Sequence, residues 1–128
     1  MNEWTIVKIS KAIAKAEGFY AIPGVSSGHS RPARNHNPGD LTIDTIEQGS
    51  GIDQGLHNSY VFYADNELGF AALRQQIRLM YDGSKIYNPD MTILEIAKKY
   101  TATDQEAWAR IVAQELKVSI DTKLKDLT

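Results

Sequence analysis

Apolar residues recur at helical spacing near the start of the chain. Four of them follow one another at intervals of three or four residues, which is the pattern of an amphipathic α-helix. These residues are Ile6, Ile9, Ile13 and Ala16. Lysines occupy the opposite face, and Gly18 follows as a residue that interrupts helices. The pattern predicts a first helix that buries one face and ends close to residue 17.

The same periodicity returns in the middle of the chain. Asp65 is suited to the N-cap of a helix, and Gly83 is suited to its C-terminal end. We therefore expect a long helix between these two residues. Its apolar face would consist of Phe70, Leu73, Ile77 and Met80.

Two Thr-x-x-Glu segments predict two further helices, because a threonine and a glutamate three residues apart can cap a helix reciprocally. The first capping box pairs Thr92 with Glu95, and the second pairs Thr103 with Glu106. The residues expected to face inward from these helices are Ile93, Ile96, Ala97, Tyr100, Trp108, Ile111, Val112 and Leu116. A short helical turn near residues 122–127 is expected to close the chain.

Residues 19–63 are rich in glycine and proline and lack helical periodicity. Residues 41–43 and 60–63 are β-branched or aromatic, so they predict two short strands, with residues 48–55 as the tip of a hairpin. The predicted fold class is therefore mostly α (α+β), with a small antiparallel β-ribbon after the first helix.

Composition narrows the possible functions. The chain has 128 residues, 42% of them hydrophobic and 23% charged, and we expect one domain over 1–128. A net charge of −2 argues against nucleic-acid binding, and no apolar run is long enough for a membrane span. The absence of cysteine excludes disulfides and thiol chemistry. No N-terminal signal peptide is visible, so the localisation stays open, and we expect a monomer.

Glu17 is the strongest catalytic candidate. It follows Ile13 by one turn, so it lies at the edge of the buried face rather than among the lysines. Burial and a helix C-terminus both disfavour a negative charge, which would raise the pKa of this carboxyl towards neutrality. Such a carboxyl can act as a general acid. The alternative is a glutamate that ends a helix and reaches back into water.

Residues 31–41 bring together two arginines, two asparagines, a histidine and an aspartate around two prolines. The amides of Asn35 and Asn37 can donate and accept hydrogen bonds, as the hydroxyl and acetamido groups of a sugar require. The same residues are also typical of a turn that hydrogen-bonds its own backbone. Both interpretations stay open. Asp40 is the first candidate for a second carboxylate, ahead of Asp44 and Asp53.

Aromatic residues near the predicted ribbon are further candidates. Alternation along a strand places Val61 and Tyr63 on one face and Tyr60 and Phe62 on the other, so one aromatic set can face a groove. Tyr63 and, from a later helix, Tyr100 are predicted to bind substrate. The three histidines His29, His36 and His57 match no metal-binding spacing, so neither a metal nor another cofactor is expected.

Three segments together resemble lysozyme-like domains of bacterial and phage peptidoglycan hydrolases, and through them the lytic transglycosylases. These segments are residues 14–20 around Glu17, residues 32–41 with the Asn-x-Asn-Pro-Gly loop, and residues 62–73. The closing segments 91–97 and 107–109 extend the resemblance through nearly the whole chain. It implies that Glu17 is the general acid and that the ribbon forms one wall of a sugar groove. Gly18 stands where many lytic transglycosylases have serine, so the subfamily stays open.

The resemblance implies cleavage of the β-1,4 bond between N-acetylmuramic acid and N-acetylglucosamine, with peptidoglycan glycan strands as the partner. With Asp40 as second carboxylate the enzyme would be a muramidase, and without one the substrate's own groups could complete a transglycosylase reaction. Two alternatives compete with an enzyme. One is a catalytically inactive glycan-binding or virion structural module, and the other is a helical protein-interaction domain.

Overall fold

A computed structural model describes residues 2–20, 30–56 and 58–128. It contains the helices α1 (Glu3–Ala16), α2 (Arg31–Arg34), α3 (Asn66–Asp82), α4 (Ile93–Tyr100) and α5 (Gln105–Leu116), and the short 3₁₀ helix η1 (Leu124–Asp126). Two antiparallel strands, β1 (Gly51–Gln54) and β2 (Ser59–Phe62), form the ribbon. The fold is therefore α+β, with a small two-stranded sheet after the first helix.

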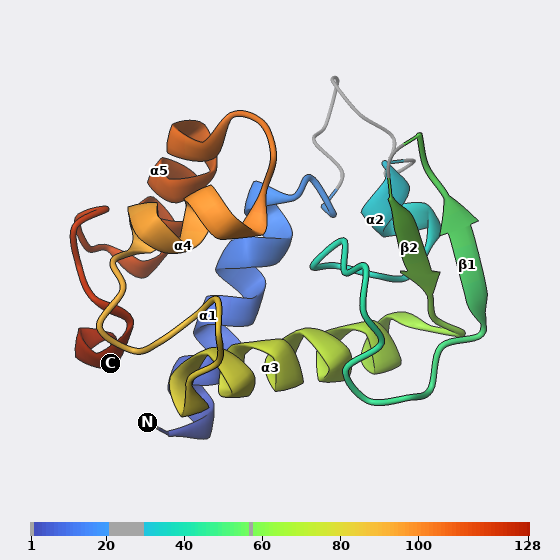
Figure 1. The fold of residues 1–128 in the computed structure, drawn as a ribbon, viewed down its shortest axis with the longest axis horizontal. Helices are drawn as coiled ribbons and strands as arrows, with labels where there is room; N and C mark the ends of the chain where they lie inside the picture. The colour runs from blue at the N-terminus through green and yellow to red at the C-terminus, as the bar shows by residue number, and fades with distance from the viewer. Residues whose placement is uncertain (1, 21–29, 57) are drawn as a thin grey trace.

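The elements divide into two regions (Figure 1). In the helical region, α1, α4, α5 and the C-terminal segment pack together. In the ribbon region, α2, β1 and β2 lie at the other end of the molecule, and α3 runs from the base of the ribbon to the N-terminal half of α1.

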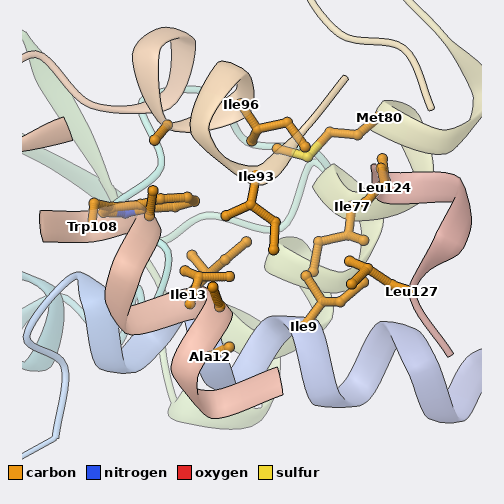
Figure 2. Packing of buried hydrophobic residues seen from close by; sticks show 14 of the residues in the cluster. Ile9, Ala12, Ile13, Ile77, Met80, Ile93, Ile96, Trp108, Leu124 and Leu127 are labelled. Carbon is orange, nitrogen blue, oxygen red and sulfur yellow. The ribbon is translucent and has the colours of Figure 1, made fainter. Parts of the chain in front are cut away.

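The predicted apolar stripe of α1 is confirmed. Ile6, Ile9 and Ile13 are almost completely buried in a cluster with side chains from α3, α4 and α5. Figure 2 shows Ile9 and Ile13 in this packing. Leu124 and Leu127 from the chain's end close the same core, so the predicted last helical turn is present as η1. Since apolar burial stabilises at about 25 cal/mol per Å², this core is the main source of stability in the helical region.

Helix ends follow the predicted capping residues in three of four cases. Asp65 accepts a hydrogen bond from the backbone N–H of Leu68, and Gly83 ends α3 with φ of 90°. Thr92 and Glu95 form the predicted reciprocal capping box at the start of α4.

The second predicted capping box is wrong. The N-cap of α5 is Asp104, with left-handed φ and ψ of 49° and 41°, and its side chain makes no cap hydrogen bond. A capping side chain needs an extended N-cap backbone to reach the next turn, which this conformation denies. Thr103 instead accepts a hydrogen bond from the Thr101 hydroxyl through its backbone carbonyl.

The prediction for the first strand is also wrong. Residues 41–43 form no strand, and β1 lies within the segment predicted as a hairpin tip. The carbonyl of Leu41 accepts the N–H of Val61 at 3.0 Å, but Asp44 then accepts hydrogen bonds from the backbone N–H groups of Ile46 and Gly49, which turn the chain before a strand forms. The second predicted strand is confirmed as β2, whose Val61 pairs with Ile52. Between the two strands, the backbone N–H of Gly55 donates a 2.8 Å hydrogen bond to the carbonyl of Asn58.

None of the helices in the described ranges is long and apolar enough to cross a lipid bilayer.

Candidate active site

The C-terminal end of α1 fixes the backbone of Glu17. Gly18 has φ of 77°, a left-handed conformation that costs glycine little. This allows the N–H of Phe19 to reach the carbonyl of Ala14 at 3.0 Å and the N–H of Gly18 to reach that of Lys15 at 3.1 Å. These two bonds are the Schellman arrangement that ends many helices. Glu17 is thereby held as the C-cap residue directly after α1, close to the helix end that the sequence predicts.

The side chain of Glu17 is mostly buried against α5. The indole N–H of Trp108 donates a hydrogen bond of 2.6 Å to Glu17 Oε2. Burial is the main cause that raises the pKa of Glu17 to about 7, and the hydrogen bond from Trp108 opposes this rise. The negative charge of Asp40 raises the pKa further, and the positive charge of Arg31 lowers it. The Glu17 carboxyl can therefore both hold and release a proton near neutral pH.

A second segment is tied directly to this helix end. The Ser30 hydroxyl donates a 2.7 Å hydrogen bond to the carbonyl of Gly18 and also accepts the N–H of Ala33 as the N-cap of α2. Pro32 fits here because the first turn of a helix has no use for its missing N–H. Arg31, at the start of α2, is consequently placed beside the end of α1.

Arg31 grips Asp40. Its Nε lies 3.0 and 3.1 Å from the two carboxylate oxygens, and its Nη2 lies 2.6 Å from Oδ2. The guanidinium also stacks on the ring of Tyr60 at 3.7 Å from the centroid, a cation–π contact. The hydrogen bond to Asp40 raises the pKa of Arg31 further, so the guanidinium keeps its positive charge. The side chain of Asp40 is only 8% exposed.

These residues line a cleft of about 810 Å³ between the two regions. One wall holds the end of α1, Tyr100 and the segment from Thr101 to Ile111. The opposite wall holds Arg31, Asp40 and Thr42 together with Leu56, Asn58 and Tyr60 of the ribbon. Glu17 and Asp40, the two predicted catalytic residues, are therefore brought together in one cleft.

The structure corrects the expectation that Asn35 and Asn37 face a substrate, because both are buried. The Asn37 amide donates to the carbonyls of Leu41 and Val61 and accepts the N–H of Leu41, all at 2.9 Å. Asn35 donates to Asp53 Oδ2 at 2.9 Å. Of the two interpretations of this loop, the structure supports the second: both amides brace the loop internally.

Tyr63 also lies away from the cleft, so its predicted contact with substrate is corrected. It is fully buried, and its hydroxyl donates to Asp44 at 3.1 Å. Burial opposes ionisation of Asp44, but the N–H groups of Gly49 and Gln48 outweigh it and lower the pKa of this carboxyl. Asp44 is thus a structural acceptor. Alternation along β2 places Tyr60, from the other aromatic set, on the cleft.

Tyr100 lines the cleft as predicted, but its hydroxyl is engaged. It donates a 2.7 Å hydrogen bond to the carbonyl of Gly39, next to Asp40. Its ring packs on Trp108 with centroids 5.1 Å apart. Tyr100 therefore connects the helix that carries it to the loop that carries Asp40.

Two important residues were not predicted as parts of the site. Trp108 has helical core spacing, and only its N–H, which needs a partner when buried, distinguishes it from the other core residues. Arg31 belongs to the polar loop, but nothing in the sequence pairs it with Asp40. The described part of the chain contains no group of three or more metal-ligating side chains. His36 contacts the carbonyl of Tyr63 at 2.9 Å, while His29 and His57 lie outside the described residues.

Comparison of the chain with protein-family models, curated proteins and solved structures finds no match. A functional assignment therefore depends on the geometry of this cleft and on the sequence motifs within it.

Proposed function

We propose that this protein is a lysozyme-like glycosidase that cleaves the β-1,4 bond between N-acetylmuramic acid and N-acetylglucosamine in peptidoglycan. The observation that carries the proposal is the Glu17 carboxyl, which faces an open cleft and has a pKa of about 7. A general acid works best when its pKa lies near the working pH, because it must hold a proton and also release it. Glu17 would protonate the glycosidic oxygen of the leaving sugar.

The chemistry of the walls supports a carbohydrate as substrate. Tyr60 offers an aromatic ring, and Thr42 and Asn58 offer hydroxyl and amide groups at the same wall. Sugars combine apolar ring faces with hydroxyl groups, so such a mixture suits them. The choice of peptidoglycan among glycans comes from the resemblance of residues 14–20, 32–41 and 62–73 to peptidoglycan-cleaving domains.

The pairing of Asp40 limits what happens after protonation. Both of its carboxylate oxygens accept hydrogen bonds from Arg31, which weakens it as a nucleophile or base. We propose that Asp40 stabilises the positive charge of the transition state, and that Glu17 acts first as acid and then as base. The attacking oxygen would come from water in a muramidase, or from the 6-hydroxyl of the substrate in a transglycosylase.

The same pairing also favours the second candidate, a glycan-binding module without activity. If Asp40 cannot assist, Glu17 has to act almost alone, and a fold of this kind can lose its chemistry while keeping its groove.

The test is release of soluble fragments from purified peptidoglycan, analysed by mass spectrometry. Glu17→Gln should lower the rate by about 10²- to 10⁴-fold, since an amide cannot donate the proton. Glu106→Gln is the matched control, because Glu106 is exposed on α5 and forms an ion pair with Arg110. Reducing ends identify hydrolysis, and anhydro ends identify transglycosylation.

Asp40→Asn separates the roles of the second carboxylate. Asparagine tolerates the left-handed φ of 50° at this position. A supporting charge should give a partial loss of about tenfold, whereas a nucleophile should give a loss as severe as that of Glu17→Gln. Full activity of Glu17→Gln would overturn the enzyme proposal, and binding to intact walls without cleavage by the wild type would establish the module.

A further inference from the structure

Among the described residues, Trp108 is the one side chain that hydrogen-bonds the Glu17 carboxyl, and it contacts one oxygen. Its Nε1 lies 2.6 Å from Oε2 of the carboxyl. Indole N–H is a donor only, so Oε2 must be the acceptor in this bond. When Glu17 is protonated, the proton therefore belongs on Oε1.

The indole is itself held rigidly. Trp108 is 5% exposed and packs in the core of the helical region (Figure 2). On its cleft side it contacts the ring of Tyr100, whose hydroxyl is fixed by the carbonyl of Gly39. The ring cannot turn its N–H elsewhere without disturbing both contacts, because close-packed interiors resist such shifts.

We propose that Trp108 is the positioning residue of the general acid, which selects Oε1 of Glu17 as the oxygen that delivers the proton into the cleft. This inference rests on the proposed function and deepens it.

The hydrogen bond from Trp108 to Glu17 has a second consequence. Hydrogen bonds to an ionised carboxylate are stronger than those to a neutral carboxyl, so the indole stabilises Glu17 as its proton leaves. That stabilisation is realised in the transition state rather than in the bound substrate.

The other groups that influence Glu17 cannot replace this contact. Asp40 and Arg31 act on it through charge with opposite signs, and they already bind each other. Tyr100 is close enough for its own pKa to be raised by burial and also by the charge of Glu17, but its hydroxyl donates to Gly39. Among these neighbours, Trp108 has the hydrogen bond that fixes the orientation of the carboxyl.

The first test needs no assay of activity and leaves the site unchanged. The chain has two tryptophans, and the other, Trp4, is 65% exposed at the start of α1. In Trp4→Phe, Trp108 is the single indole, and its fluorescence should report the charge of the carboxyl bound to it. We expect a titration with a midpoint near pH 7, and its absence in Trp4→Phe/Glu17→Gln. An emission that does not titrate, or that titrates equally without Glu17, would overturn the inference.

The second test is Trp108→Phe against the matched control Trp4→Phe, with pH profiles on peptidoglycan. Loss of a hydrogen bond to a charged group should lower kcat by about 10- to 100-fold and change KM by less than about threefold. In Trp108→Phe the alkaline limb of the pH–rate profile should shift to higher pH by about one unit, because the lost hydrogen bond lowers the pKa of Glu17 in the wild type. A merely structural tryptophan would lower the melting temperature and leave the limb in place, which would contradict the proposal.

The two failures are distinguishable. A fluorescence titration assigned to Glu17 in a protein that cleaves no peptidoglycan would remove the proposed function and keep the Glu17–Trp108 coupling. Cleavage that needs Glu17, combined with an unchanged limb in Trp108→Phe, would keep the function and remove the positioning role.

Discussion

The helical region and the ribbon region of this protein are held together by different chemistry. In the helical region, isoleucines of α1 and α3, Trp108 and the leucines of the C-terminal segment form one continuous apolar core. In the ribbon region, the apolar cluster is small: Leu41, Val61, Tyr63 and Ala72. There the loop from 35 to 44 is organised around buried polar side chains, with Asn37 completely buried.

The difference matters because the cleft lies between the two regions. The helical side supplies Glu17 and Trp108 from long, well-packed helices, which suits groups that must hold one geometry. The ribbon side supplies Arg31, Asp40 and Tyr60 from short elements, and the loop that carries Asp40 is held by hydrogen bonds between Asn37 and the backbone. Hydrogen bonds are directional, so they can fix a charged pair at a defined place without a large core.

The start of α3 lies close against the loop that carries Asn35 and Asn37. A Cβ added at Gly69 would lie 1.9 Å from the backbone carbonyl oxygen of His36. A glycine in the first turns of α3 is therefore required by the close approach of the loop, although it weakens the helix intrinsically. This contact determines how closely the loop with Asn35 and Asn37 packs against α3.

The largest effect is expected in the apolar region. Ile77 is fully buried in the helical core, so Ile77→Ala should lower the free energy of unfolding by about 2–5 kcal/mol. Ile77 does not line the cleft, so activity per folded molecule should be unchanged. Urea unfolding measures the loss, with Ile86→Ala as the control, because Ile86 is 56% exposed. A loss below about 1 kcal/mol would mean that this core is less important than its burial indicates.

The polar region should respond to a different substitution. Asn37→Ala leaves the buried N–H of Leu41 and the carbonyl of Val61 without the Asn37 amide, while the carbonyl of Leu41 keeps the N–H of Val61 as a donor. Since a buried unsatisfied group costs about 1–3 kcal/mol, we expect a loss of about 3 kcal/mol in total after local relaxation. Unlike Ile77→Ala, it should also lower activity, because Asp40 follows in the same loop.

Urea unfolding and initial rates on peptidoglycan test the prediction, with exposed Asn66→Ala as the control. An Asn37→Ala protein with near wild-type stability would show that the ribbon region relies on its small apolar cluster after all.

The contrast also explains how far the sequence predicts this fold. Helical periodicity with caps located α1, α3 and α4, because these helices bury one continuous apolar face each. The ribbon was placed only in part. Residues 41–43 have strand propensity, but the turn that Asp44 makes with the backbone overrides it. Such a bond depends on where the chain goes next, which periodicity does not contain.

The candidate site divides in the same way. Glu17 could be predicted because its position relative to the apolar face and to Gly18 is a local property of one helix. The hydrogen bond from Trp108 to Glu17 and the ion pair of Arg31 with Asp40 could not be predicted, because both depend on the tertiary fold. The first joins residues 91 positions apart, and the second joins residues 9 positions apart. Asn35 and Asn37 have the same composition whether they bind a sugar or brace a loop, so only their burial decides.

The smallest expected effect is the pH dependence that Glu17, at the boundary between the two regions, gives to the free energy of unfolding. Its pKa is raised from 4.5 in the unfolded chain to about 7 in the folded protein. The folded state therefore favours the protonated carboxyl, so stability is fully retained below pH 4.5 and is lost as the pH rises to about 7. Glu17→Gln removes this dependence. Relative to that variant, the wild type should lose about 2 kcal/mol between pH 4.5 and pH 7.5, a value reduced for the partial exposure of the side chain.

Urea unfolding of both proteins across this pH range measures the difference, and Glu106→Gln should show no comparable change, because Glu106 is exposed. The expected sign is the reverse of the usual one for a carboxylate, since most ionised carboxylates in folded proteins gain stability from a partner as the pH rises. Here the Trp108 N–H and Arg31 only partly compensate for the burial of a negative charge. Parallel curves for the wild type and Glu17→Gln would mean that Glu17 is solvated like a surface carboxylate, and would contradict its role as an acid at neutral pH.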